Sequence, residues 1–272
     1  KVTKGRGENP LFKTFTHAAQ EAGYPYTNDM NGYQQEGFGP MDRTTGNGIR
    51  HSTSIGYLRP VLQRKNLTVL THTDAQRLIL EGKRIRGIEF NRKGRAGSAL
   101  ANRDVILSGG PINNPKLLML SGIGPAAHIA ESGIKPTHSL PGVGENLQDH
   151  LEIYFQMECL PPVSIYKYYN LFGKAWIGAR WLFTRTGLGA SNQLESGGFI
   201  RSHIGVEHPN LQYHFFPMAV RYDGKSPNVG HGFQAHVGPM RSKSRGWVRL
   251  RSNDPNDAPQ IQVVHVVGDI IE

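Results

Sequence analysis

The stretch from Asp104 to His150 constrains the fold of this chain most, because it joins an apolar run, a glycine turn and a helix start. Val105–Leu107 predicts a short β-strand, and Ser108-Gly109-Gly110 follows it directly. Glycines in such a turn let backbone N–H groups approach a ligand. Asn114-Pro115 has the form of a helix N-cap followed by proline at the first helical position. The pattern predicts a site for a large anionic cofactor, although an ordinary strand–turn–helix connection fits the same residues.

Composition narrows the class of protein. The chain has 272 residues and a formal net charge of +10, but its basic residues are scattered. The densest basic cluster, residues 241–251, alternates with Val248 and Leu250 like the solvated face of a strand, so no nucleic-acid partner is expected. Cys159 is the only cysteine and the histidines lack metal-ligand spacing, so no disulfide and no metal site are expected. The chain starts at Lys1 without an initiator Met or signal peptide, which predicts a fragment.

Periodicity predicts two portions that meet near residue 150. Helices are expected over 11–22, from Ser52 or Ser54 to Leu62, and around 174–183. Strands are expected over 67–70, 77–80, 85–90, 153–157, 211–216, 233–237 and 247–250, with 77–80 and 85–90 joined as a hairpin. Residues 1–150 form an α/β portion and 151–272 a mostly antiparallel one, so the fold class is α/β (α+β).

The segment from Gly110 through Pro115, Leu117-Leu118 and 121–124 resembles the second signature of the glucose–methanol–choline (GMC) family of flavin oxidoreductases. Asn114 departs from it, since the family usually has Ser or Thr there. Further similar segments are 9–11, 32–43, 52–58, 141–150, 197–202 and 236–247, and they favour the choline-oxidising branch. After Ile261 the sequence leaves the family pattern.

The resemblance implies a partial FAD-binding domain in residues 1–150 and a partial substrate-binding domain with an antiparallel sheet in 151–272. The implied reaction is the FAD-dependent oxidation of choline to betaine aldehyde. Two alternatives stay open: a GMC alcohol oxidoreductase with another substrate, and a catalytically inactive fragment or interaction module.

The family's amino-terminal G-x-G-x-x-G unit and carboxy-terminal His/Asn catalytic pair have no counterpart here, so no catalytic residue is assigned. Gly122–Ala127 fits G-x-G-x-x-A but follows a helix and contains Pro125, which does not suit a dinucleotide fingerprint.

The resemblance also implies cofactor residues. Ala75 occupies the position where the family's backbone meets the adenine of FAD, and Ser108, Gly109, Gly110, Asn114 and Pro115 lie along the cofactor. Asn146, Gln148 and Asp149 belong to a loop beside the flavin.

For the substrate, the resemblance implies that Glu195 faces the trimethylammonium group and that His214 contacts the substrate. A quaternary ammonium donates no hydrogen bond, so a carboxylate and aromatic faces must recognise it. The candidate faces are Trp176, Trp181, Phe199, Tyr213 and Phe215. On the residues alone, a salt-bridged Glu195 and a packed His214 are favoured over these substrate roles.

The expected partners are choline and a membrane electron acceptor, with peripheral membrane association. By resemblance to the animal enzymes the location would be the mitochondrial inner membrane, or another membrane surface if the protein is bacterial. No continuous apolar run reaches transmembrane length.

Overall fold

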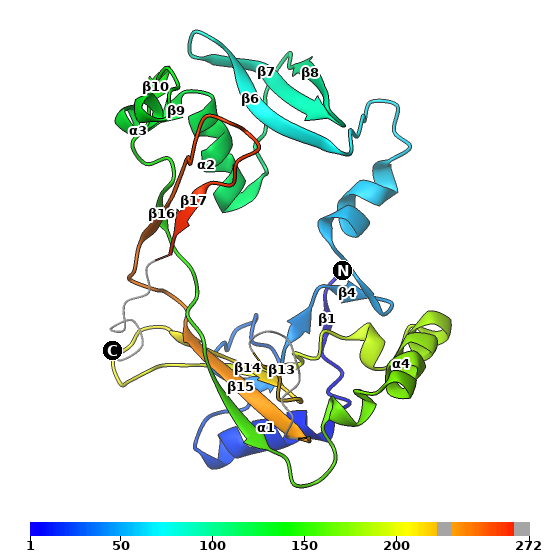
Figure 1. Ribbon diagram of the computed structural model, residues 1–272. Helices are drawn as coiled ribbons and strands as arrows, with labels where there is room; N and C mark the ends of the chain where they lie inside the picture. Colours follow the sequence, from blue (N-terminus) through cyan, green and yellow to red (C-terminus); the bar gives the residue numbers. More distant parts are fainter. Residues whose placement is uncertain (222–229, 264–272) are drawn as a thin grey trace. The chain divides into compact units, whose positions relative to one another are not determined.

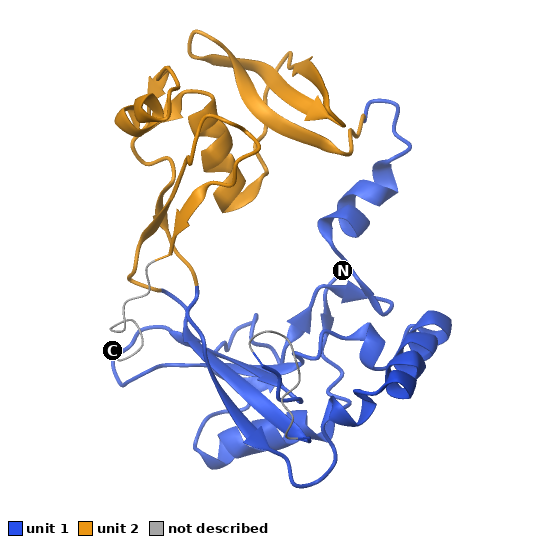
Figure 2. Cartoon of the chain, in the orientation of Figure 1, with its two compact units in different colours: residues 1–67, 150–241, 272 blue, residues 68–149, 242–271 orange. Residues whose placement is uncertain are grey.

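The computed structural model describes residues 1–221 and 230–263, and the chain divides into two compact units that interleave along the sequence (Figure 2). Unit 1 contains residues 1–67 and 150–241, and unit 2 contains residues 68–149 and those after 241. One change of unit falls between Asp149 and His150, where the sequence predicts a boundary. The assignment of FAD binding to 1–150 and substrate binding to 151–272 stays a prediction. Most of the divergent tail after Ile261 lies outside the described residues.

Unit 1 is built on a five-stranded antiparallel sheet in the order β12-β15-β14-β13-β2 (Figure 1). The strands are β12 (Ile153–Glu158), β15 (Gly232–Pro239), β14 (Leu211–Phe216), β13 (Ser196–Ile200) and β2 (Gly37–Pro40). Helix α1 (Pro10–Glu21) packs on one face, where the ring of Phe15 stacks on that of Phe215 with centroids 4.6 Å apart. Successive side chains of a strand point to opposite faces, so His214 lies on the face away from α1.

Helix α1 begins where the sequence predicts. The side chain of Asn9 accepts a hydrogen bond of 3.0 Å from the N–H of Leu11, and Pro10 occupies the first helical position. Leu11, Phe12 and Ala19 turn their side chains into the core, and this buried apolar stripe holds the helix against the sheet. The remaining elements of unit 1 are β1 (Thr3–Lys4), β3 (Asp42–Arg43), β4 (Thr45–Gly46), β5 (Ile49–Arg50), the turns η1 (Ser54–Leu58), η2 (Arg59–Val61), η3 (Ile165–Tyr168) and η4 (Leu188–Ala190), and helix α4 (Leu171–Thr184).

Unit 2 contains a three-stranded meander of β6 (Thr73–Glu81), β7 (Arg84–Arg92) and β8 (Arg95–Leu100). Its other elements are α2 (Gly110–Leu120), β9 (Ile123–Gly124), α3 (Ala126–Glu131), β10 (His138–Ser139), β11 (Glu145–Leu147), β16 (Gly246–Arg249) and β17 (Gln260–Gln262). Met119, Leu120, Ile129, Val143 and Leu250 form the buried core of this unit. Because Leu250 follows the end of β16, this core joins parts of the chain that are far apart in sequence.

The structure confirms the mixed α/β class with antiparallel sheets, and it confirms the hairpin of β6 and β7. Two expected strands are absent. Residues 67–70 and 105–107 are not strands, because an apolar run becomes a strand only beside a hydrogen-bonding partner strand and no described strand pairs with either. The helix expected up to Leu62 is present as the continuous helical segments η1 and η2, which are of π and 3₁₀ type and end at Val61. No helix of the described residues is long and apolar enough to cross a bilayer.

Candidate functional site

Helix α2 starts five residues before the position that the sequence predicts. Gly109 is its N-cap, Gly110 and Pro111 open its first turn, and Pro115 lies inside the helix. The first turn has no acceptors for its N–H groups, so Pro111 fits there without loss. Asn114 therefore lies within the helix and is not its N-cap: its Oδ1 accepts the N–H of Gly109 at 2.8 Å and its Nδ2 donates to the carbonyl of Leu107.

Four of the predicted cofactor residues line one hollow of about 580 Å³ in unit 2. They are Ala75, Ser108, Gly109 and Asn114, and Lys116 also lines the hollow. Its volume lies in the range of small-molecule sites. Ala75 stands where the register of β6 against β7 shifts, so the strand bends at the wall of the hollow.

Gly110 has a φ of +83°, and a Cβ atom built there would meet no other atom within 4 Å. The space above the first turn of α2 is therefore open to a ligand, and the left-handed backbone favours glycine. The positive end of an 11-residue helix favours an anionic group here, while the charges of Lys116 and Asp74, which both line the hollow, offset each other. The geometry and charge suit a phosphate-containing cofactor.

A second hollow of about 400 Å³ lies on the other side of α2. It is lined by Asn114 and Pro115 together with the predicted loop residues Asn146 and Gln148. Asn146 has a φ of +61°, which Asn tolerates better than most residues, and the side chain of Gln148 donates to the carbonyl of Ser242 at 2.9 Å. Asn114 thus lies between the two hollows that the predicted cofactor residues line.

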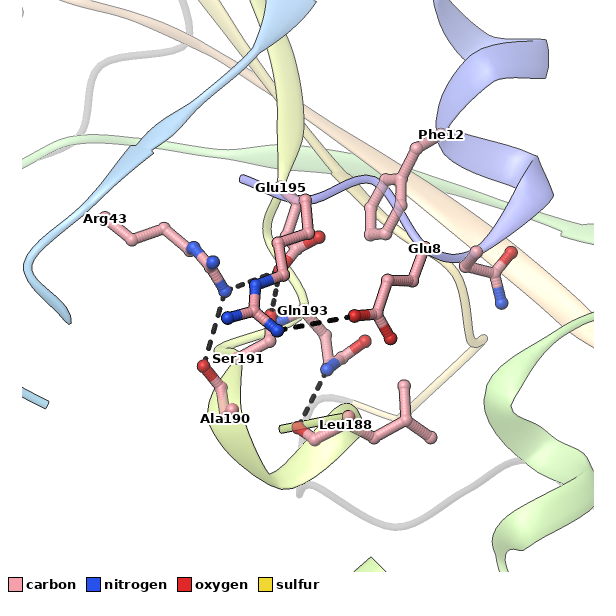
Figure 3. Close-up of a pocket in the computed structure, with 11 residues that line it drawn as sticks. Glu8, Phe12, Arg43, Leu188, Ala190, Ser191, Gln193 and Glu195 are labelled. Carbon is pink, nitrogen blue, oxygen red and sulfur yellow. Dashed lines mark hydrogen bonds and ion pairs between the residues drawn. The ribbon is translucent and has the colours of Figure 1, made fainter. Parts of the chain in front are cut away.

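Glu195 is the most completely buried carboxylate among the candidate residues (Figure 3), with an exposed fraction of 4%. Its Oε1 lies 2.5 Å from Nη1 of Arg43 and accepts a hydrogen bond from the hydroxyl of Ser191. Its Oε2 accepts the N–H of Gly7 at 2.7 Å. The carboxylate is therefore fully hydrogen-bonded and its charge is compensated, as the salt-bridged alternative expected.

Two cavities border Glu195, and Phe12 lines both of them. One, with a volume of about 10 Å³, is lined also by Glu8 and Gln193, and the other has a volume of about 600 Å³. Within the described residues the Nε atom of Arg43 is buried without a hydrogen-bond partner. The smaller cavity has room for about one water molecule, so a trimethylammonium group requires the larger one. The role of Glu195 at the substrate stays a prediction, and it requires the cationic group to reach a carboxylate already held by three donors.

His214 belongs to a cluster on the sheet face away from α1. Its Nδ1 lies 3.4 Å from Oε1 of Glu152, and the other oxygen of Glu152 lies 3.1 Å from Nδ1 of His236. Burial lowers the pKa of His214, an effect that Glu152 partly offsets and that His236 and His150 reinforce. Sequence reasoning gave Glu152 and His236 no part in the site, because only the β14–β15 register places His214 opposite His236.

The five aromatic candidates are divided among different surroundings. Tyr213 and Phe215 alternate with His214 along β14 and therefore face α1. Phe199 is buried, Trp176 is exposed on α4, and Trp181 donates its indole N–H to the carbonyl of Gly48 at 2.7 Å. Tyr213 and Phe215 therefore share no sheet face with His214, and an aromatic partner for the ammonium group stays a prediction.

Comparison with known proteins fits this geometry. A family model described as GMC oxidoreductase matches residues 1–152. The chain belongs to the GMC oxidoreductase family. The oxygen-dependent choline dehydrogenase of Brucella anthropi is 54% identical over 262 residues, which are 96% of this chain and 47% of that protein. The enzyme of the same name from Chromohalobacter salexigens is 54% identical over 261 residues, with the same coverage of both proteins.

Solved structures give the same fold. A formate oxidase aligns with a TM-score of 0.86 at 24% identity, over 96% of this chain and 50% of that one. Pyridoxine 4-oxidase from Mesorbium loti aligns with a TM-score of 0.78 at 25% identity, over 96% and 48%. The chain spans about half the length of the curated relatives it matches.

Proposed function

We propose that this chain is part of an enzyme that oxidises choline to betaine aldehyde with FAD. The observation that carries the proposal is the 54% identity to oxygen-dependent choline dehydrogenases over 96% of the chain. The hollow lined by Ala75, Ser108, Gly109 and Asn114 supports the cofactor part of the proposal. Another alcohol substrate and an inactive fragment are the competing outcomes.

In the proposed enzyme, Ala75 would border the adenine, and Ser108, Gly109 and Gly110 would offer close backbone contact to the cofactor. Asn114 would hold the glycine turn in shape through its bonds to Gly109 and Leu107. FAD, when bound, would supply the redox chemistry by accepting a hydride from the alcohol carbon. The protein would supply position and charge.

At the substrate, His214 would contact the alcohol, and Glu195 would supply the carboxylate for the ammonium group. Because burial lowers the pKa of His214, its imidazole is mainly neutral at pH 7 and its unprotonated nitrogen can accept the hydroxyl hydrogen. The buried pair of Glu195 and Arg43 carries no net charge, so the ammonium contact would use the dipole of that pair unless Arg43 moves.

The first test measures cofactor binding. The purified chain is titrated with FAD, and we expect it to retain the flavin. Ala75→Trp, which fills the hollow, should weaken retention at least tenfold, whereas Ala96→Trp on exposed β8 should not. A chain that binds no FAD, or that is weakened equally by both substitutions, would refute the cofactor site.

The second test measures the substrate. Choline should bleach the absorbance of the bound flavin without oxygen, and the uncharged analogue 3,3-dimethylbutan-1-ol should do so more slowly. Equal rates for both compounds would favour another alcohol substrate. Retention of flavin without bleaching by any alcohol would favour the inactive fragment.

Peripheral association with an anionic membrane surface forms the second part of the proposal, and helix α4 supports it. The side chains of Phe172 and Phe183 are 86% and 83% exposed, and that of Trp176 is 62% exposed. The helical period places them with Leu171 and Leu182 on one side of α4, while Ile177 and Trp181 face inward. Lys174 and Arg180 flank the stripe, and no acidic residue occurs between Leu160 and Leu194. Exposed aromatic and basic side chains on one helix are typical of interfacial binding.

The relatives reported above are bacterial proteins and give no support to a mitochondrial location, so that expectation stays a prediction. Vesicles of phosphatidylcholine, with and without phosphatidylglycerol, test the surface by co-sedimentation. We expect binding only to the anionic vesicles, lost on Phe172→Ser with Phe183→Ser and kept in Ile204→Ser, whose exposed side chain lies outside α4. Self-association through this face without vesicle binding would refute the membrane proposal.

A further inference from the structure

The sheet face away from α1 is polar at one edge. Across β12, β15 and β14 the paired positions place Tyr154, His236 and His214 in one row, and Gln156 and Gln234 in the next row. Glu152 lies just before β12 and carries the negative charge of this patch, with its side chain 41% exposed. The hydrogen bonds of Gln156, Gln234 and His236 have one consistent pattern of donors and acceptors.

The backbone N–H of Val220 determines the orientation of the Gln234 side-chain amide. The backbone N–H of Val220 donates to Oε1 of Gln234 at 3.0 Å. A backbone N–H is always a donor, so this contact fixes which end of the Gln234 amide is the oxygen. The Nε2 of Gln156 donates to the same oxygen at 2.9 Å, which agrees with that orientation.

The amide orientation determines the tautomer of His236. Nε2 of Gln234 lies 2.6 Å from Nε2 of His236, and an amide nitrogen can only donate. Nε2 of His236 must therefore carry a lone pair, and its proton must sit on Nδ1. That Nδ1–H lies 3.1 Å from Oε2 of Glu152 and donates to it. In the neutral ring of His236, the tautomer with its proton on Nδ1 satisfies both contacts.

The Nδ1–H of His236 occupies Oε2 of Glu152 and leaves Oε1 for His214. Oε1 of Glu152 faces Nδ1 of His214, so the carboxylate favours a proton on this nitrogen. In the neutral ring of His214 the lone pair then lies on Nε2. His150 and His236 are the other titratable groups that act on His214, and β13 places only Gly197 opposite it.

We propose that Gln234, His236 and Glu152 form a hydrogen-bond relay that positions His214 and fixes which of its nitrogens accepts a hydrogen bond. Glu152 is thus a positioning residue. The relay rests on the proposed function only for the contact between His214 and the substrate. By holding Nδ1 as the donor, it presents Nε2 of His214 as the acceptor for an alcohol hydroxyl.

Nuclear magnetic resonance of the chain tests the relay without any turnover. Histidine ¹⁵N shifts at pH 7 report the tautomer, and we expect the proton of His236 on Nδ1. Gln234→Glu replaces the amide donor by an acceptor, so we expect a proton to appear on Nε2 of His236. Glu152→Gln removes the charge that favours protonated His214, and its titration midpoint should fall by about 1 pH unit.

Glu158→Gln is the matched control, because it changes a carboxylate at the other end of β12, where no ion pair with His214 is found. It should leave both histidines unchanged. The resonances of Phe12 and Phe215 report whether each variant keeps the core of unit 1. A wild-type His236 with its proton on Nε2 would overturn the relay, and so would a His214 midpoint that moves no further in Glu152→Gln than in Glu158→Gln.

A kinetic measurement separates the relay from the proposed function. In a flavin-loaded form that oxidises choline, Glu152→Gln should shift the acidic limb of the kcat/KM profile by the same amount as the His214 midpoint. If the midpoint moves and the profile does not, the relay stands and the role of His214 at the substrate fails.

Discussion

Replacing Glu195 by glutamine should destabilise unit 1 strongly, whatever its role at the substrate. The carboxylate and the Arg43 guanidinium are 4% and 5% exposed, and Nη1 of Arg43 lies 2.5 Å from Oε1. Glutamine keeps the shape but leaves a buried cation without its counter-charge, and removing one partner of a buried pair costs about 3–5 kcal/mol. Glutamine offers one oxygen where the carboxylate offers two, so either the N–H of Gly7 or the donors of Arg43 and Ser191 would face an amide NH2 group. The loss should therefore be about 3–5 kcal/mol.

Urea unfolding followed by tryptophan fluorescence measures this loss. An equal dependence of the unfolding free energy on urea concentration in both proteins would show that the folded and unfolded states are comparable. Glu81→Gln is the matched control, because its pair with Arg86 is exposed and should contribute less than about 1 kcal/mol. A loss below about 1 kcal/mol for Glu195→Gln would refute the reasoning and would show that Arg43 finds compensation elsewhere. If added choline raises the free energy of unfolding of the wild type but not of the variant, the proposed ammonium contact is supported.

Three further predictions concern unit 2. Met119 is fully buried, so Met119→Ala should lower the free energy of unfolding by about 2–5 kcal/mol in the same assay. Gly144 has a φ of +82° and a Cβ there would lie 2.2 Å from the carbonyl of Val248, so Gly144→Ala should unfold at lower urea, whereas Gly82→Ala, with open space, should cost far less. Burial and Arg249 lower the pKa of His128, whose Nε2 accepts the N–H of Leu250 at 3.0 Å. The stability from this bond is complete above about pH 6.5 and is lost as the pH falls toward the lowered pKa; His128→Gln should flatten that part of the pH profile.

Local signals in the sequence predicted the elements that depend on neighbouring residues. Asn9-Pro10 specified the start of α1, because an N-cap and a first-turn proline act within a few residues. The hairpin around Gly82 was predicted because its turn and its two strands are contiguous. Asn114 was predicted to be the N-cap of α2, but its side-chain oxygen accepts the N–H of Gly109, which precedes it, and Gly109 is the N-cap.

The sequence by itself determined the family, the mixed α/β class and the residues that line the candidate cofactor hollow, because these depend on motifs and short-range periodicity. Only the tertiary structure decided what surrounds Glu195 and His214. Arg43 lies 152 residues before Glu195, and Glu152 lies 84 residues before His236. No local pattern encodes such pairings: they follow from strand register and from the rule that a buried charge or amide must find its partner. The glycine turn between Asp104 and His150 therefore identifies the family, while burial and register set the chemical state of the side chains proposed to act on the substrate.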